Sequence, residues 1–195
     1  MIFNNQQMEL APEQFAAQLD RWYCKWAKAN PRYFPLEDRL TQKANDIGYL
    51  EMADLAAITC VLGNPFNIRA RVQNANTEDE IKEKTGQAIK HLDNPVSALE
   101  AMMSIKRWGR TYSSKTLRCI CPRSYVALDS LLIQNISQSY LSSKNEVDRY
   151  IQFIKLCQRI LHEVSAPGPR RNNLWFLADV EIGLFQFVWD RGKIV

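Results

Sequence analysis

A run of basic residues surrounds one glycine near the middle of the chain. The stretch from Lys106 to Lys115 reads Lys-Arg-Trp-Gly-Arg-Thr-Tyr-Ser-Ser-Lys, with Gly109 placed for a tight turn between two helices. Backbone N–H groups at such a turn, together with neighbouring cations, suit the binding of a phosphate. Asp129 follows fourteen residues after Lys115 and adds one carboxylate. A phosphate-binding turn followed by a carboxylate indicates work on DNA.

Positive charge is concentrated around this turn. The 195 residues carry a formal net charge of only +4. Between residues 104 and 128 there is no acidic residue, and the basic ones are Lys106, Arg107, Arg110, Lys115, Arg118 and Arg123. On charge alone two interpretations stay open, a nucleic-acid footprint or a basic helix face in contact with solvent.

Apolar residues recur at helical spacing. Phe15, Leu19, Trp22 and Trp26 show the pattern, and no segment alternates with the period of two that a strand would give. Three capping patterns predict helix starts, namely Thr77 with Glu80, Asn94 before Pro95, and Ser143 with Glu146. We therefore expect an all-α protein of roughly eight to ten short helices.

Composition indicates a soluble globular protein. With 46% hydrophobic residues, the chain can bury one core or form two lobes that share a cleft. The apolar runs are too short to span a bilayer and the N-terminus does not read as a signal peptide, so we expect a cytoplasmic protein without membrane contact. The five cysteines show no Cys-x-x-Cys spacing and the two histidines stand alone, which predicts free thiols and no metal site.

The order of helix, glycine turn, helix, short loop and capping aspartate resembles the helix-hairpin-helix DNA glycosylase superfamily. The matching segments are 62–72, 103–115, 117–122, 126–130 and 178–185. Within the superfamily the chain is similar to small bacterial glycosylase-like proteins related to the 8-oxoguanine branch. The resemblance implies an all-α, two-lobed fold, with residues 1–40 and 143–195 in lobe A. Residues 41–142, with the hairpin near 106–115, would form lobe B.

The resemblance also implies a catalytic role for Asp129. In the family, the aspartate at the head of the helix after the hairpin faces the extruded nucleotide, and Asp129 matches it. A carboxylate there stabilises the oxocarbenium-like transition state of glycosidic cleavage. Asp129 is also a good N-cap for a helix from Ser130, and both roles can hold at once.

Lys115 is the second catalytic candidate, in a register that differs from the family's. Bifunctional members carry a nucleophilic lysine two residues before a small residue. With Ser113 as the small residue, Thr111 takes that position and Lys115 lies one helical turn further on the same face. A Schiff-base nucleophile, a phosphate contact and a surface lysine all stay open for Lys115. The displaced register favours a monofunctional enzyme.

Two segments are expected to contact DNA. Family hairpins usually carry Gly-x-Gly, whereas this one has Gly109 alone. The segment from Asn64 to Arg71 resembles the asparagine-rich stretch that fills the gap left by the extruded base in 8-oxoguanine glycosylases, or else it is a helix N-terminus with polar caps. The residues predicted to bind DNA are Asn64, Asn67, Arg69, Arg71, Lys106, Arg107, Trp108, Gly109, Arg110, Ser113 and Ser114. Candidates for a stacking wall, or for the core, are Trp22, Tyr23, Trp26, Tyr33 and Phe34.

The predicted function is excision of a modified base from double-stranded DNA by a monomeric enzyme without a cofactor. The base would be an oxidised purine, as in DNA repair, or a modified base of phage DNA, as in phage defence. A non-catalytic DNA-binding protein on the same fold is the alternative, favoured by the displaced lysine and the single hairpin glycine. A protein-interaction module or toxin is a third possibility.

Overall fold

Helices make up most of the protein, as the sequence predicts. The computed structural model describes residues 8–63 and 65–195. The elements in chain order are β1 (Met8–Leu10), α1 (Pro12–Ala16), α2 (Leu19–Ala29), α3 (Tyr33–Ile47), α4 (Met52–Leu62), α5 (Pro65–Ala75), α6 (Glu78–Lys90), α7 (Pro95–Met103), α8 (Gly109–Ile120), α9 (Ser130–Asn135), α10 (Glu146–Glu163), η1 (Arg171–Asn173), α11 (Leu177–Trp189) and β2 (Gly192–Ile194). None of the described helices has the length and apolar character needed to cross a membrane.

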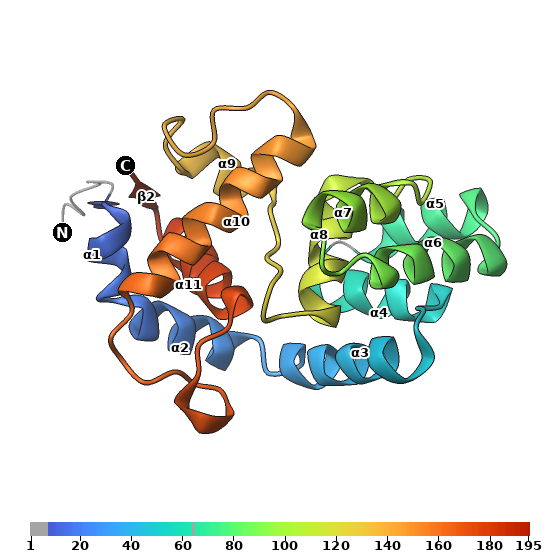
Figure 1. The fold of residues 1–195 in the computed structure, drawn as a ribbon, viewed down its shortest axis with the longest axis horizontal. Coiled ribbons are helices and arrows are strands. Elements are labelled where there is room, and N and C mark those ends of the chain that lie inside the picture. Colours follow the sequence, from blue (N-terminus) through green and yellow to red (C-terminus); the bar gives the residue numbers. More distant parts are fainter. Residues whose placement is uncertain (1–7, 64) are drawn as a thin grey trace.

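The helices gather into two lobes (Figure 1). In one lobe α2 packs along α11, with α1 and α10 beside them, while α3 to α8 pack together in the other. Because α3 buries Leu36 and Leu40 and packs on α4 and α8, it belongs to the second lobe. In the same way α9 packs on α11 and β2, in the first lobe. The boundaries expected near residues 40 and 142 therefore lie too late in the chain.

Two short strands join the ends of the described chain. β1 and β2 pair in parallel, with Met8 opposite Gly192 and Leu10 opposite Ile194. The sequence pattern predicted no strand, because three residues are too few to reveal a period of two.

Helix starts follow the predicted caps with one exception. Thr77 Oγ1 accepts the N–H of Glu80 at 3.2 Å, and Asn94 caps α7. At α10 the cap is Asn145 rather than Ser143. Ser143 Oγ instead accepts the N–H of Asn145 at 3.1 Å, so the capping box predicted with Glu146 was wrong. Two polar residues compete at this start, and the one next to the helix caps it.

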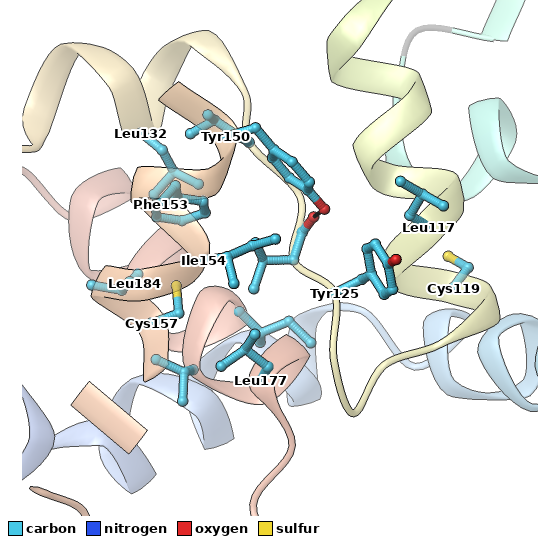
Figure 2. Close-up of a cluster of buried hydrophobic side chains, with 14 of the residues drawn as sticks. Leu117, Cys119, Tyr125, Leu132, Tyr150, Phe153, Ile154, Cys157, Leu177 and Leu184 are labelled. Carbon is cyan, nitrogen blue, oxygen red and sulfur yellow. Dashed lines mark hydrogen bonds between the residues drawn. The ribbon is translucent and has the colours of Figure 1, made fainter. Parts of the chain in front are cut away.

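A connection that begins with a turn, residues 121–129, runs between the lobes from α8 to α9. Tyr125 turns toward Leu117 of α8, and the labelled side chains of α9, α10 and α11 lie on the other side of the connection (Figure 2). Tyr150 of α10 donates its O–H to the carbonyl of Val126 at 2.9 Å. Because residues 125–128 are buried and held in this way, the connection delivers Asp129 to a fixed place at the head of α9.

Candidate functional site

A pocket of about 360 Å³ brings the two predicted catalytic residues together. Asp129 and Lys115 both line it, although one precedes α9 and the other lies within α8. Two of its walls, α2 and α11, belong to one lobe, and the other two, α4 and α8, belong to the other lobe. The complete lining is Trp26, Ala29, Asn30, Val61, Leu62, Lys115, Arg118, Asp129, Glu181, Phe185, Gln186 and Trp189.

Asp129 caps α9, as its sequence position predicts. Its backbone is extended, with φ −107° and ψ 177°, and its Oδ1 accepts the N–H of Leu132 at 3.1 Å. The residue is half-buried, so the carboxylate is anchored at one oxygen while it lines the pocket. Asp129 therefore caps α9 and lines the pocket at the same time.

Two buried side chains hold the backbone just before Asp129. Ser114 Oγ accepts the N–H of Leu128 at 3.0 Å. Glu181 of α11 accepts a hydrogen bond from the backbone of Ala127. Sequence reasoning placed Ser114 on a DNA phosphate and gave Glu181 no role, because no local pattern reveals a partner on a distant helix. Both residues fix the position from which the Asp129 carboxylate reaches the pocket.

Lys115 lines the pocket with a half-buried side chain. Its Nζ donates a hydrogen bond to the carbonyl of Leu62 at the end of α4, and it lies 5.4 Å from the centre of the Tyr112 ring. Burial lowers the pKa of Lys115, and the nearby Arg118 guanidinium lowers it further, while Asp129 opposes both effects. A lowered pKa increases the share of neutral, nucleophilic amine. Of the roles left open by the sequence, a plain surface lysine does not fit this position.

A buried ion pair also lines the pocket. Arg118 of α8 bonds Glu181 of α11, and only 4% and 2% of their side-chain surfaces are exposed. The guanidinium carbon of Arg118 lies 4.7 Å from the centre of the Tyr33 ring. Burial raises the pKa of Glu181, although Arg118 counteracts this effect. No motif in the sequence indicates this pair, because the two residues lie on different helices.

Two left-handed residues shape the turn between α7 and α8. Arg107 has φ 69° and Gly109 has φ 62°, with Trp108 between them at φ −82° and ψ −41°. This is the spacing of the Gly-x-Gly pair, with Arg107 in the first glycine position. Alternation of left- and right-handed residues directs successive N–H groups to one side and forms an anion-binding concavity. The concavity forms here with only one glycine, and one of its donors is already in use, because the N–H of Trp108 bonds the carbonyl of Ile105 at 3.1 Å.

Some of the residues predicted to contact DNA have buried side chains. The side chains of Trp108, Ser113 and Ser114 are buried, a position that does not suit direct contact of these side chains with DNA. Trp108 packs inside the lobe and donates its indole N–H to Thr116 Oγ1 at 3.1 Å. Ser113 and Ser114 are buried because they lie where α8 packs on the core, whatever the polarity of these small residues.

The three cations of the turn differ in solvent exposure and in ion pairing. Arg107 is exposed, and so is Lys106, whose Nζ lies 3.0 Å from Glu80. Arg110 has only 11% of its side chain exposed and pairs with Glu146 of α10 at 3.3 Å. Arg107 is therefore the strongest phosphate candidate among the three, and Arg110 bridges the lobes.

The asparagine-rich segment lies on α5, outside the pocket lining. Asn67, Arg69 and Arg71 are exposed there, and Asn64 lies outside the described residues. Asn76, just after α5, bonds the backbone of Lys106 twice, donating to its carbonyl at 2.9 Å and accepting its N–H at 3.0 Å. The end of α5 is thus fixed to the hairpin turn, which sequence reasoning did not detect.

The five aromatic candidates for a stacking wall belong mainly to the core. Trp22, Tyr23, Trp26 and Tyr33 are buried. Of the five, only Trp26 lines the pocket, whereas the other aromatic lining residues, Phe185 and Trp189, come from α11 and were not predicted.

No protein-family model, curated protein or solved structure matches the chain. Within residues 8–63 and 65–195, no three His, Cys, Asp or Glu side chains are grouped as a metal site would require.

Proposed function

We propose that this protein is a DNA glycosylase of the helix-hairpin-helix type, which extrudes a modified base from double-stranded DNA and cleaves its N-glycosidic bond. The observation that carries the proposal is the meeting of Asp129 and Lys115 in one pocket between two lobes. The turn with Arg107 and Gly109 at the start of α8 supplies phosphate-binding donors on the same helix as Lys115.

The proposed reaction uses the Asp129 carboxylate to stabilise positive charge. A base inside a duplex must first leave the stack, at a cost of a few kcal/mol, before the pocket can enclose it. As the bond from C1′ to the base breaks, the base leaves with the electron pair and the sugar becomes cationic. The anchored carboxylate lowers the energy of that cation and accepts a proton from the attacking water. The proposed enzyme is monofunctional and leaves an abasic site.

Base release from defined duplexes tests the proposal. The protein is incubated with duplexes that carry an oxidised purine or a phage-type modified cytosine, and abasic sites are then cleaved with hot alkali. We expect alkali-dependent cleavage with at least one substrate, and cleavage slower by about a hundredfold or more with Asp129→Asn. Tight duplex binding without release from any substrate would instead favour the non-catalytic DNA-binding alternative.

Strand cleavage by Lys115 is a second candidate activity, favoured by the position of its half-buried amine in the pocket and by its lowered pKa. The neutral amine would attack C1′ and lose a proton as the base departs. Opening of the C1′–O4′ bond would then give a protonated imine. Loss of a C2′ proton would expel the 3′ phosphate.

Borohydride decides between the two activities, because hydride addition at C1′ converts the imine to a stable amine. A covalent adduct that is present in the wild type, lost in Lys115→Gln and kept in Lys106→Gln would establish Lys115 as a nucleophile. Base release without an adduct would leave the monofunctional proposal in place.

A further inference from the structure

The end of α2 forms one rim of the pocket, residues 28–32, and a second hollow lies beside it. This smaller cavity, of about 200 Å³, shares Ala29, Asn30 and Val61 with the lining of the pocket. Arg32 and Cys60 line only the smaller cavity. The hollow surface therefore continues from the pocket across the α2 rim to Arg32, which lies just before α3 at the junction of the two lobes.

The exposed side of α2 next to this rim is basic. Residues 21–32 contain no Asp or Glu, and the basic ones are Arg21, Lys25, Lys28 and Arg32. Positions 21, 25 and 28 share one face of the helix, because they are spaced by four and three residues. All four basic side chains are exposed. This run is a second concentration of positive charge, separate in sequence from the one around Gly109.

Lys28 and Arg32 are the members of this run that adjoin the hollow surface. Arg32 lines the smaller cavity, and Lys28 directly precedes Ala29, which lines both hollows. Neither forms an ion pair with any residue that the structure describes, whereas Lys25 is paired with Asp190 at 2.5 Å. Two cations beside one hollow surface, without a counterion, favour an anionic ligand.

We propose that Lys28 and Arg32 bind the phosphates that flank the extruded nucleotide, an inference that rests on the proposed glycosylase function. Double-stranded DNA carries one negative charge per about 1.7 Å of helix axis, so a nucleotide that enters the pocket brings its neighbouring phosphates to the rim. The turn with Arg107 would position the strand on the α8 side of the pocket, and the α2 rim would position it on the other side. The charge alone would also suit an acidic protein segment, but only a DNA strand must run past the pocket when its nucleotide enters it.

The salt dependence of duplex binding tests this surface without knowledge of the modified base. A duplex with one tetrahydrofuran abasic analogue is titrated by anisotropy at several salt concentrations. When Lys28→Gln and Arg32→Gln are combined, the slope of log affinity against log salt should flatten by about 1.4 to 1.8, because each phosphate contact contributes about 0.7 to 0.9. Lys155→Gln, which removes an exposed lysine of α10 outside both hollows, should leave the slope unchanged.

Cys60 reports occupancy of the smaller cavity directly. Among the described residues it is the only exposed cysteine, and it lines this cavity together with Arg32. Its reaction rate with a maleimide is taken as the difference between wild type and Cys60→Ser. We expect this rate to fall severalfold when the wild type binds the duplex, and to stay unchanged in the presence of poly-glutamate.

The possible results separate this surface from the glycosylase proposal. An equal salt slope in wild type and in the double variant, with Cys60 unprotected by the duplex, would overturn the α2 rim and leave the glycosylase proposal intact. Equal flattening by Lys155→Gln would also overturn it, since the effect would then come from net charge. Protection of Cys60 by poly-glutamate but not by the duplex would overturn it in favour of an acidic protein partner. Failure of the wild type to bind the duplex at any salt concentration would overturn both proposals.

Discussion

At the scale of single residues, Asp129 combines a structural and a proposed chemical role. One of its oxygens accepts the N–H of Leu132, and this hydrogen bond fixes the carboxylate at the head of α9. Ser114 and Glu181 hold the two preceding peptides. An anchored carboxylate needs little reorganisation when a cation develops beside it, which is the condition for electrostatic catalysis.

The two roles of Asp129 can be separated by substitution with asparagine. Asn is as good an N-cap as Asp, so the melting temperature of Asp129→Asn should change little. Base release under single-turnover conditions should fall by about a hundredfold or more, because the amide carries no charge. Asp46→Asn, on the exposed side of α3, removes one charge elsewhere and should cut like wild type. Undiminished release by Asp129→Asn would remove the carboxylate from the mechanism.

At the scale of elements, the turn between α7 and α8 depends on backbone conformation more than on side chains. Arg107 and Gly109 both have positive φ, and the left-handed conformation costs an L-residue about 1–2 kcal/mol. Arg107 bears this strain at a position where glycine would avoid it. Asn76 fixes the adjacent peptide of Lys106 from the other side, so the turn is held in its strained form.

Substitution of Gly109 isolates this backbone strain. A Cβ built on Gly109 would meet no atom within 4 Å in the described structure, so Gly109→Ala introduces no clash. We expect it to lower the free energy of unfolding by about 1 kcal/mol and to weaken DNA binding by loss of the turn geometry. Arg107→Gly is the matched variant, which should gain stability while it loses a cation. Urea denaturation gives both values, and unchanged stability in Gly109→Ala would contradict the assigned conformation.

The sequence predicted correctly those structural features that depend on a single helix or its first turn. Helical periodicity predicted the helical class, and the position of Asp129 before Ser130 predicted its cap. It failed where two elements meet. Burial of Ser114 depends on the connection that packs over α8, and the pairing of Arg118 with Glu181 depends on how α8 and α11 are placed. The polar pattern of α8 could not distinguish a phosphate ligand from a buried hydroxyl that serves Leu128.

At the scale of the whole molecule, the distribution of free cations should set the salt dependence of DNA binding. Arg107→Gln removes an exposed charge from the hairpin turn, and the slope of log affinity against log salt should flatten by about 0.9. Arg110→Gln should leave the slope unchanged, because Arg110 is already paired with Glu146 and largely buried. Titrations at four salt concentrations compare the two variants. If Arg110→Gln flattened the slope and Arg107→Gln did not, the phosphate would lie at Arg110, and its ion pair with Glu146 would have to open on binding.

The two lobes are also joined by an ionic cluster away from the pocket. Arg170, before η1, lies 2.6 Å from Glu37 of α3 and 2.7 Å from Asp179 of α11. Tyr33 donates its O–H to Glu37 at 2.5 Å, and Asp179 accepts the N–H of Phe176 at 2.9 Å. Since α3 and α11 belong to different lobes, the guanidinium ties the two lobes together.

Removal of Arg170 should therefore destabilise the molecule in a pH-dependent way. Burial already raises the pKa of Asp179, and Arg170 opposes that effect. Arg170→Met leaves both carboxylates buried without their cation, a loss of about 3 kcal/mol at neutral pH. In the variant the pKa of Asp179 rises further. Below a pH of about 4, the pKa of the carboxyl in the unfolded chain, Asp179 is protonated in both states and the variant keeps its stability. As the pH rises through the pKa of Asp179 in the folded state, this stability is lost.

Urea denaturation from pH 4 to pH 8 checks this sign. The stability gap between wild type and Arg170→Met should widen as the pH rises, whereas Arg159→Met, which removes an exposed pair with Glu13, should give a small gap at every pH. A gap for Arg170→Met that stays constant over this range would show that packing of the Arg170 side chain on Phe34 and Phe176, rather than its charge, holds the lobes together.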